Sequence, residues 1–93
     1  MKSYAAIDRI EEKFAVCEVE LVPVEESPNL SVSEKETEMI DVQLNRVTQL
    51  CGDVEEGDII VVEHDRTNVI DVYGKDELEK QRRIKLLEEI MKS

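Results

Sequence analysis

Few residues of this 93-residue chain have types and spacing that could do chemistry, and two aspartates are the first candidates. Asp8 precedes Arg9, and a second Ile-Asp dipeptide ends at Asp71. Two carboxylates brought close together could act as an acid/base pair or bind a divalent ion. On a strand, however, Asp8 and Arg9 would point to opposite faces and could not form one convergent site. We expect each carboxylate to cap a turn or to pair with a cation such as Arg83, since structural ion pairs are commoner than catalytic dyads.

His64 is the sole histidine of the sequence and stands next to Asp65. A metal site built on a His-Asp pair needs further ligands at defined places, and there is no second histidine to supply one. We therefore expect His64 to be a solvated residue in a polar turn. The alternative function that the residues leave open is a small metal-dependent or acid/base enzyme, which would use Asp8 and Asp71 with His64 and Asp65 as further candidates.

Nucleophilic or cofactor chemistry has little support in the sequence. Cys17 and Cys51 lie far apart and form no Cys-x-x-Cys pair or Cys/His cluster, so we expect two reduced, buried or half-buried thiols. No Gly-x-Ser-x-Gly elbow occurs, and the three glycines are too scattered to cradle a phosphate. The sequence thus assigns no catalytic, cofactor-binding or metal-binding residue, and it favours a protein that is not an enzyme.

Alternation of apolar and polar residues predicts the elements that would position these side chains. It places strands within residues 3–22, 38–44 and 57–73. Residues 23–37 contain both prolines and four glutamates, a mixture typical of a surface loop. Residues 45–58 space their apolar side chains irregularly and predict no regular element before a turn at Gly57.

Residues 76–92 are predicted to form an amphipathic helix. Asp76 is suited to the N-cap, and Glu79 stands three residues later in the capping-box position. Arg83 projects into the apolar side of this helix, so we expect the first half to meet the body through charge. The apolar side itself occupies only the second half, at 3.6-residue spacing, and consists of Ile84, Leu86, Leu87, Ile90 and Met91.

The net charge of −11 is unevenly distributed along the chain. Residues 74–93 hold six basic and five acidic residues, a net +1, so residues 1–73 carry −12. A near-neutral tail beside a strongly acidic body indicates that the tail packs on that body. The acidic balance also argues against nucleic acid and anionic membrane surfaces as partners, since both attract clustered Lys and Arg.

The lengths and positions of the apolar segments predict the cellular location of the protein. No apolar run approaches the roughly 20 residues that span a bilayer. The first residues meet a charge pair too early to contain a signal-peptide core. We therefore expect a cytoplasmic protein.

Three stretches resemble one known family. They are Ala-x-Ile-Asp-Arg-Ile-Glu-Glu-x-x-Ala-Val at residues 5–16, Glu-Gly-Asp-Ile-Ile-Val-Val-Glu at 56–63, and Ile70-Asp71 followed by a charged helix with Arg82-Arg83-Ile84. Together they resemble the DUF3006 family of small bacterial proteins of unknown function, over the first 20 residues and about the last 40, whereas residues 23–55 look like an expansion. The family has no assigned activity. Some members are associated with metallo-β-lactamase-fold hydrolases, which implies an accessory role beside such an enzyme.

The sequence as a whole predicts one domain, residues 1–93, of mainly β (α+β) class. We expect about five short strands in a small twisted antiparallel sheet or an SH3- or OB-like barrel, with one C-terminal helix covering an open end or face. The favoured function is a non-catalytic accessory or protein-interaction module of the bacterial cytoplasm that docks another protein on a sheet edge or on its acidic face. Self-association is left open.

Overall fold

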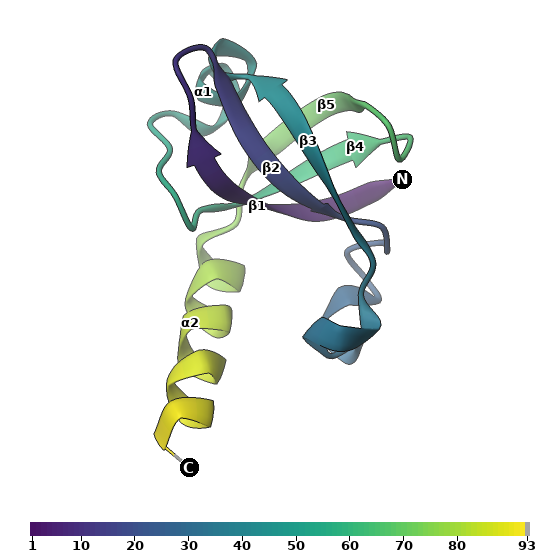
Figure 1. Ribbon diagram of the computed structural model, residues 1–93, viewed down its shortest axis with the longest axis vertical. Helices are drawn as coiled ribbons and strands as arrows, with labels where there is room; N and C mark the ends of the chain where they lie inside the picture. The colour runs from purple at the N-terminus through teal and green to yellow at the C-terminus, as the bar shows by residue number, and fades with distance from the viewer. Residues whose placement is uncertain (93) are drawn as a thin grey trace.

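The computed structural model describes residues 1–92, with the side chains of all of them except Val32 and Lys92. A five-stranded antiparallel sheet curls into a half-barrel, and a long helix extends from one end of it (Figure 1). The mainly β fold with five strands and a C-terminal helix is therefore confirmed. The strands are β1 (Lys2–Ile10), β2 (Phe14–Glu20), β3 (Thr37–Gln43), β4 (Ile59–His64) and β5 (Val69–Lys75), and the helices are α1 (Leu44–Cys51) and α2 (Glu77–Lys92).

The strand order in the sheet is β3-β2-β1-β4-β5, with every neighbouring pair antiparallel. The arrangement of the first four strands is that of a Greek key, in which the fourth strand returns to lie beside the first. A five-stranded, partly open Greek-key barrel is the architecture of OB-type folds. Of the two closures that the sequence left open, the connectivity thus favours the OB-like one.

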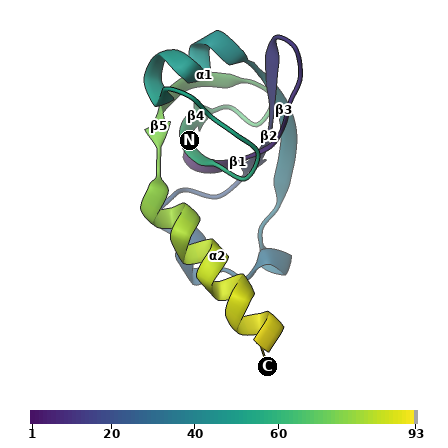
Figure 2. The same cartoon turned by 90° about the vertical axis from the view of Figure 1, so that its left-hand side faces the viewer.

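The core is aliphatic because the chain has almost no aromatic residues to fill it. All five strands contribute buried apolar residues to the core, and Val47 of α1 joins them. Helix α1 lies over one end of the half-barrel and contacts β5, β3 and β2 (Figure 2). The largest fully buried apolar side chains are Ile7, Val19, Val47, Ile60 and Val62.

Helix α1 is the element that the sequence did not predict. Leu44 was expected to end a strand, but it begins this helix instead. Leu44, Val47 and Cys51 pack on the core at a spacing of three and four residues, which is helical. The signal was hidden because Leu50, in the same stretch, is exposed, and because Gln43 at the N-cap makes no side-chain capping bond.

The segment between β2 and β3 leaves the barrel at the same end as α2 (Figures 1 and 2). It contains two short 3₁₀ turns, Ser27–Asn29 and Val32–Glu34, within the loop that the sequence predicted. The amide of Leu21 donates to the carbonyl of Glu36 at 2.9 Å, which joins the two ends of the segment. Ser27 is buried and so fixes the segment to the rest of the molecule.

Candidate functional site

Asp8 and Arg9 contact each other, so the prediction that they point to opposite faces was wrong. The β1–β2 ladder pairs Ile7 with Cys17 and Arg9 with Val16, which leaves Asp8 as an extra residue in a β-bulge. A bulge interrupts the alternation of side chains. The Arg9 Nη1 atom therefore lies 3.0 Å from Asp8 Oδ2, in a pair that is about half exposed.

Asp71 lies far from Asp8, so the structure does not bring the two aspartates together. Asp71 on β5 pairs with Glu63 on β4, and Glu63 pairs with Lys2 at the start of β1. Asp8 lies six positions along β1 from Lys2, which at about 3.3 Å per position is on the order of 20 Å. Within residues 1–92, no group of three or more His, Cys, Asp or Glu side chains could hold a metal ion.

His64 is buried, with 1 % of its surface exposed, so the prediction of a solvated histidine was wrong. It is the last residue of β4, on the inward-facing side with Ile60 and Val62. Its Nδ1 accepts from the amide of Arg66 at 3.2 Å, so its Nε2 carries the proton and donates to Ser3 Oγ at 2.9 Å. Burial lowers the pKa of His64 and keeps the ring neutral.

Asp65, next to His64, caps the turn between β4 and β5. Its Oδ1 accepts from the amides of Thr67 at 3.0 Å and Asn68 at 2.7 Å. These hydrogen bonds lower the pKa of Asp65 and fix the β4–β5 turn. Because this carboxylate is exposed and turned into its own loop, it does not form a common site with the buried imidazole of His64.

The two cysteines are free and are placed as expected. Cys17 is buried and Cys51 is half-buried. Burial raises the pKa of Cys17 to about 12 and also raises the pKa of Cys51. Both thiols are therefore protonated at neutral pH, and neither has the thiolate character that a nucleophile needs.

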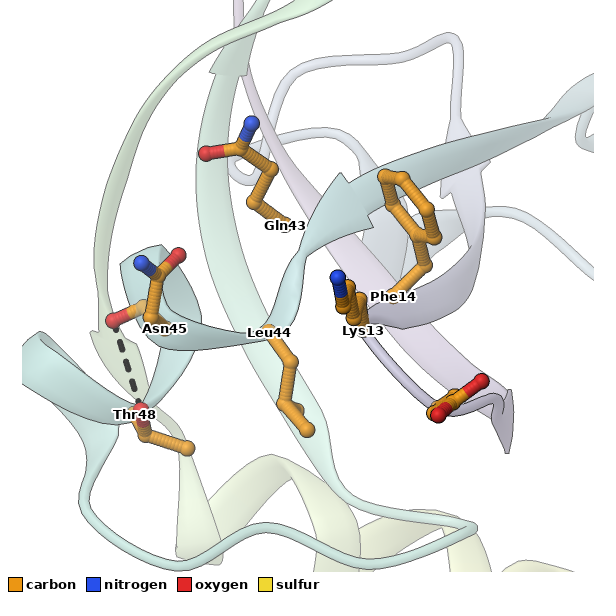
Figure 3. Close-up of a pocket in the computed structure, with 7 residues that line it drawn as sticks. Lys13, Phe14, Gln43, Leu44, Asn45 and Thr48 are labelled. Carbon is orange, nitrogen blue, oxygen red and sulfur yellow. Dashed lines mark hydrogen bonds between the residues drawn. The ribbon is translucent and has the colours of Figure 1, made fainter.

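A surface hollow of about 480 Å³ lies between the β1–β2 turn and the start of α1, and Figure 3 shows the residues that line it. Phe14, 42 % exposed, and Leu44 supply its apolar wall. The amides of Gln43 and Asn45 lie on one side of it, and Glu12 is its one carboxylate. The hollow could receive an apolar side chain, but its lining has no pair of groups suited to acid/base or nucleophilic catalysis.

The first half of α2 is fixed to the barrel by buried charge, as predicted. Glu20 on β2 and Glu79 on α2 are only 6 % and 5 % exposed. Arg83 bridges them, with Nη2 at 2.9 Å from Glu20 Oε2 and Nε at 2.6 Å from Glu79 Oε2. Ser27 and Lys35 from the loop also reach Glu20, at 2.6 and 3.5 Å. We call these five residues the Glu20 cluster.

The pKa of Glu79 shows how strongly the arginines hold this carboxylate. Burial raises its pKa, but the hydrogen bonds from Arg82 and Arg83 outweigh burial, so the net shift is downward. The guanidinium of Arg83 also lies 5.3 Å from the centre of the Tyr4 ring on β1, within the range of a cation–π contact. Arg83 therefore binds α2 to two strands at once.

A second charged contact holds the beginning of α2. Asp58, 2 % exposed, accepts from Lys80 Nζ at 2.6 Å and from the amide of Glu55 at 2.9 Å. Burial raises the pKa of Asp58, but these hydrogen bonds outweigh it and lower the pKa overall.

Asp76 caps the helix as predicted, since its Oδ1 accepts from the amide of Glu79 at 2.9 Å. In place of the reciprocal capping-box bond, the Asp76 amide donates to the carbonyl of Ile59.

The second half of α2 extends away from the barrel (Figures 1 and 2). Its apolar residues are exposed. The exposed fractions rise toward the end of the helix, from 41 % at Ile84 to 79 % at Met91. The expectation that the helix covers the barrel therefore holds only for its first turns. We call the exposed apolar residues in the second half of α2 the apolar stripe. They are Ile84, Leu86, Leu87, Ile90 and Met91.

Fold and site together define a small five-stranded β half-barrel with a charge-anchored helical arm. No family model, no curated protein and no solved structure matches the chain. The resemblance to DUF3006 therefore stays a prediction. Among the helices of residues 1–92, none combines the length and apolar character needed to cross a bilayer.

Proposed function

We propose that the chain is a non-catalytic protein-interaction module, accessory to another protein, and that the partner binds the apolar stripe of α2. The observation that carries this proposal is the exposure of all five stripe residues on a helix whose base is held by hydrogen-bonded ion pairs. Contiguous apolar patches of this kind are typical of interaction sites in soluble proteins. An amphipathic helix placed in an apolar groove is also a recurring mode of protein recognition.

The anchor of α2 supports a binding role for the rest of the helix. A helix that only stabilised the barrel would turn its apolar side toward the core. Here the buried side of the first half contains Glu79 and Arg83, and the apolar side begins only beyond them. Because the base is fixed, a partner would bind a helix of defined direction and would order fewer groups on binding.

The sheet edges offer less to a partner than the helix does. On the outer edge of β5, Arg46 of α1 donates to the carbonyls of Val69 at 3.3 Å and Ile70 at 2.7 Å. On β3 at the other edge, Glu38 and Asp41 are exposed, and charged residues of this kind discourage strand pairing. The stripe of α2 is therefore the better supported of the surfaces considered for docking.

Capture of a partner from native lysate tests the proposal. We expect the tagged full chain to recover a protein in stoichiometric amount, and the double variant Leu87→Glu with Ile90→Glu to lose it. Leu78→Glu is the matched control, because Leu78 is 84 % exposed on the opposite side of the same helix. Equal recovery by all three chains, or recovery of nothing, would contradict the proposal.

A further inference from the structure

We propose that the open edge of β3 binds an extended, basic segment of another protein as a sixth, antiparallel strand of the sheet. This surface is separate from the apolar stripe of α2, so the inference goes beyond the proposed function and does not depend on it. β3 is one of the two border strands of the half-barrel (Figure 2). Addition of a strand to an exposed sheet edge is a recurring mode of peptide recognition.

The hydrogen bonds between β2 and β3 show which backbone groups of this edge are open. At one end of the ladder the amide of Leu21 donates to the carbonyl of Glu36 at 2.9 Å. At the other end the amide of Leu44 donates to the carbonyl of Lys13, also at 2.9 Å. Hydrogen-bonded positions alternate with open ones in an antiparallel ladder, and the register between these two bonds has no shift, so the even-numbered residues of β3 bond to β2. The residues whose amides and carbonyls point to the open side are Thr37, Met39 and Asp41.

The two borders of the sheet differ in how far their backbone groups are covered. On β5, Arg46 of α1 donates to the carbonyls of Val69 and Ile70. On β3, no hydrogen bond from within residues 1–92 reaches the outward backbone groups of Thr37, Met39 and Asp41. The side chains of these three residues are also exposed. An added strand would therefore reach this edge without displacing a contact of the chain, and it would pair with the open groups by main-chain hydrogen bonds.

The charges beside this edge select the kind of strand that binds. Residues 36–43 contain three carboxylates and no lysine or arginine, and the adjacent Lys35 is held by Glu20. Glu38 and Asp41 on β3 are exposed, and so is Glu18 on the neighbouring β2. These carboxylates repel a second copy of the same edge or any other acidic strand, and they attract lysine or arginine. The charge that discourages indiscriminate pairing therefore favours a basic segment.

The two faces of β3 predict the side-chain pattern of the added strand. Ile40 and Val42 are buried on the inner face, whereas Met39 and Asp41 are exposed on the outer face. A strand paired with β3 alternates its side chains between the same two faces. Its residues level with Met39 and Asp41 should be lysine or arginine. Its residues level with Ile40 and Val42 lie at the border of the core and should be apolar, such as valine.

Titration of the ¹⁵N-labelled full chain with the peptide Lys-Val-Lys-Val-Lys-Val-Lys tests the proposal by NMR. We expect amide shifts concentrated in β3 and binding that weakens as the salt concentration is raised. The peptide Glu-Val-Glu-Val-Glu-Val-Glu has the same strand pattern with the opposite charge and should not bind. Equal binding of the two peptides, or no binding of the basic peptide at millimolar concentration, would overturn the proposal.

The substitution Met39→Pro tests the backbone bonds. Proline removes an amide that points away from β2, so the β2–β3 ladder keeps its hydrogen bonds, and proline is found at such edge positions in natural sheets. We expect Met39→Pro to weaken binding of the basic peptide by at least about tenfold in Kd. Met39→Ala is the matched control, because it shortens the same side chain and keeps the amide, and it should weaken binding far less. If the two variants bind equally well, the peptide binds elsewhere and the proposal is overturned.

Methylated peptides test the same bonds on the unaltered protein, so the result does not depend on the folding of Met39→Pro. In the antiparallel arrangement the lysine amides of the peptide face β3 and the valine amides face solvent. Methylation of the lysine amides should abolish binding, whereas methylation of the valine amides should leave it. An equal effect of both methylations would overturn the proposed pairing.

The double variant Leu87→Glu with Ile90→Glu separates this inference from the proposed function. Both substitutions lie on α2, so this variant should bind the basic peptide as the wild type does, whether or not it still captures a partner from lysate. Loss of peptide binding in this variant would show that the peptide is held by α2 and would overturn the assignment to β3.

Discussion

The two halves of α2 reverse the usual relation between polarity and burial. The first half is charged and yet provides the buried contacts, through Glu79 at 5 % exposure and through Arg83. The second half is apolar and yet exposed, with Ile90 and Met91 at 69 % and 79 %. The difference shows that the charged base of α2 fixes the direction in which the helix leaves the barrel. It does not bury the apolar side of the helix. The second half therefore leaves its apolar side chains exposed.

The largest effect should come from breaking the Glu20 cluster with Arg83→Leu. Leucine would leave the buried carboxylates of Glu20 and Glu79 without the cation that bridges them. Removing one partner from a buried ion pair costs about 3–5 kcal/mol. Because Arg83 is partly exposed and Arg82 still holds Glu79, we expect a loss of about 2 kcal/mol in the free energy of unfolding, measured in urea.

The matched control is Lys85→Leu on the exposed half, which should change stability by less than about 0.5 kcal/mol. A gain in stability from Arg83→Leu would show that the cluster does not hold the helix.

Mild acid should weaken the charged half of α2 without direct effect on the apolar half. The folded-state pKa values of Asp58 and Glu79 lie below their ordinary values of 3.8 and 4.5. Their contribution to stability is therefore complete above those values and is lost as pH falls below them toward the folded-state pKa. We expect the protection of the amides in the first turns of α2, taken as the exchange rate relative to the intrinsic rate at the same pH, to fall over this range.

The control for the acid experiment is Asp58→Asn combined with Glu79→Gln, which removes both titrating groups. This double variant should be less stable at neutral pH, but the acid-dependent loss of protection in the first turns should be smaller than in the wild type. A loss of protection of the same size in both proteins would assign the acid effect to other carboxylates of the chain.

A second pH effect, which begins at higher pH, should come from His64 at the end of β4. His64 has an ordinary pKa of 6.5, which burial lowers in the folded protein. The unfolded chain therefore takes up a proton first as pH falls, and the stability that the neutral ring provides is lost from about pH 6.5 downward. His64→Gln keeps a side chain able to donate to Ser3 Oγ and should abolish this step in a series of urea titrations. A step that persists in the variant would show that another group titrates there.

The sequence predicted the fold class and the charged base of α2 because both follow from local pattern. Strand alternation and the placement of Arg83 within an apolar stripe are visible in the residues themselves. His64 was misjudged because its neighbours are polar, although it continues the inward alternation of Ile60 and Val62. The alternation of positions 60, 62 and 64 was the feature of the sequence that could have identified His64 as buried.

Other features could not be read from the sequence, because they depend on long-range pairing. The bulge at Asp8 arises from the register of β1 against β2, and nothing in the residues around Asp8 specifies it. The exposure of the apolar stripe likewise depends on the direction in which α2 leaves the barrel. Periodicity identifies an apolar side of a helix, but it does not show whether that side meets the core, a partner or solvent.

The smallest effect should come from the apolar half of α2 in the isolated protein. Leu87→Ala and Ile90→Ala remove side chains that are already 60 % and 69 % exposed, so little burial is lost within one chain. At low micromolar concentration we expect each to change the free energy of unfolding by less than about 0.5 kcal/mol, measured by urea titration. A loss above 1.5 kcal/mol at low concentration, on the order of that for a buried leucine, would mean that the stripe packs within its own chain and that the contrast between the two halves of α2 is wrong.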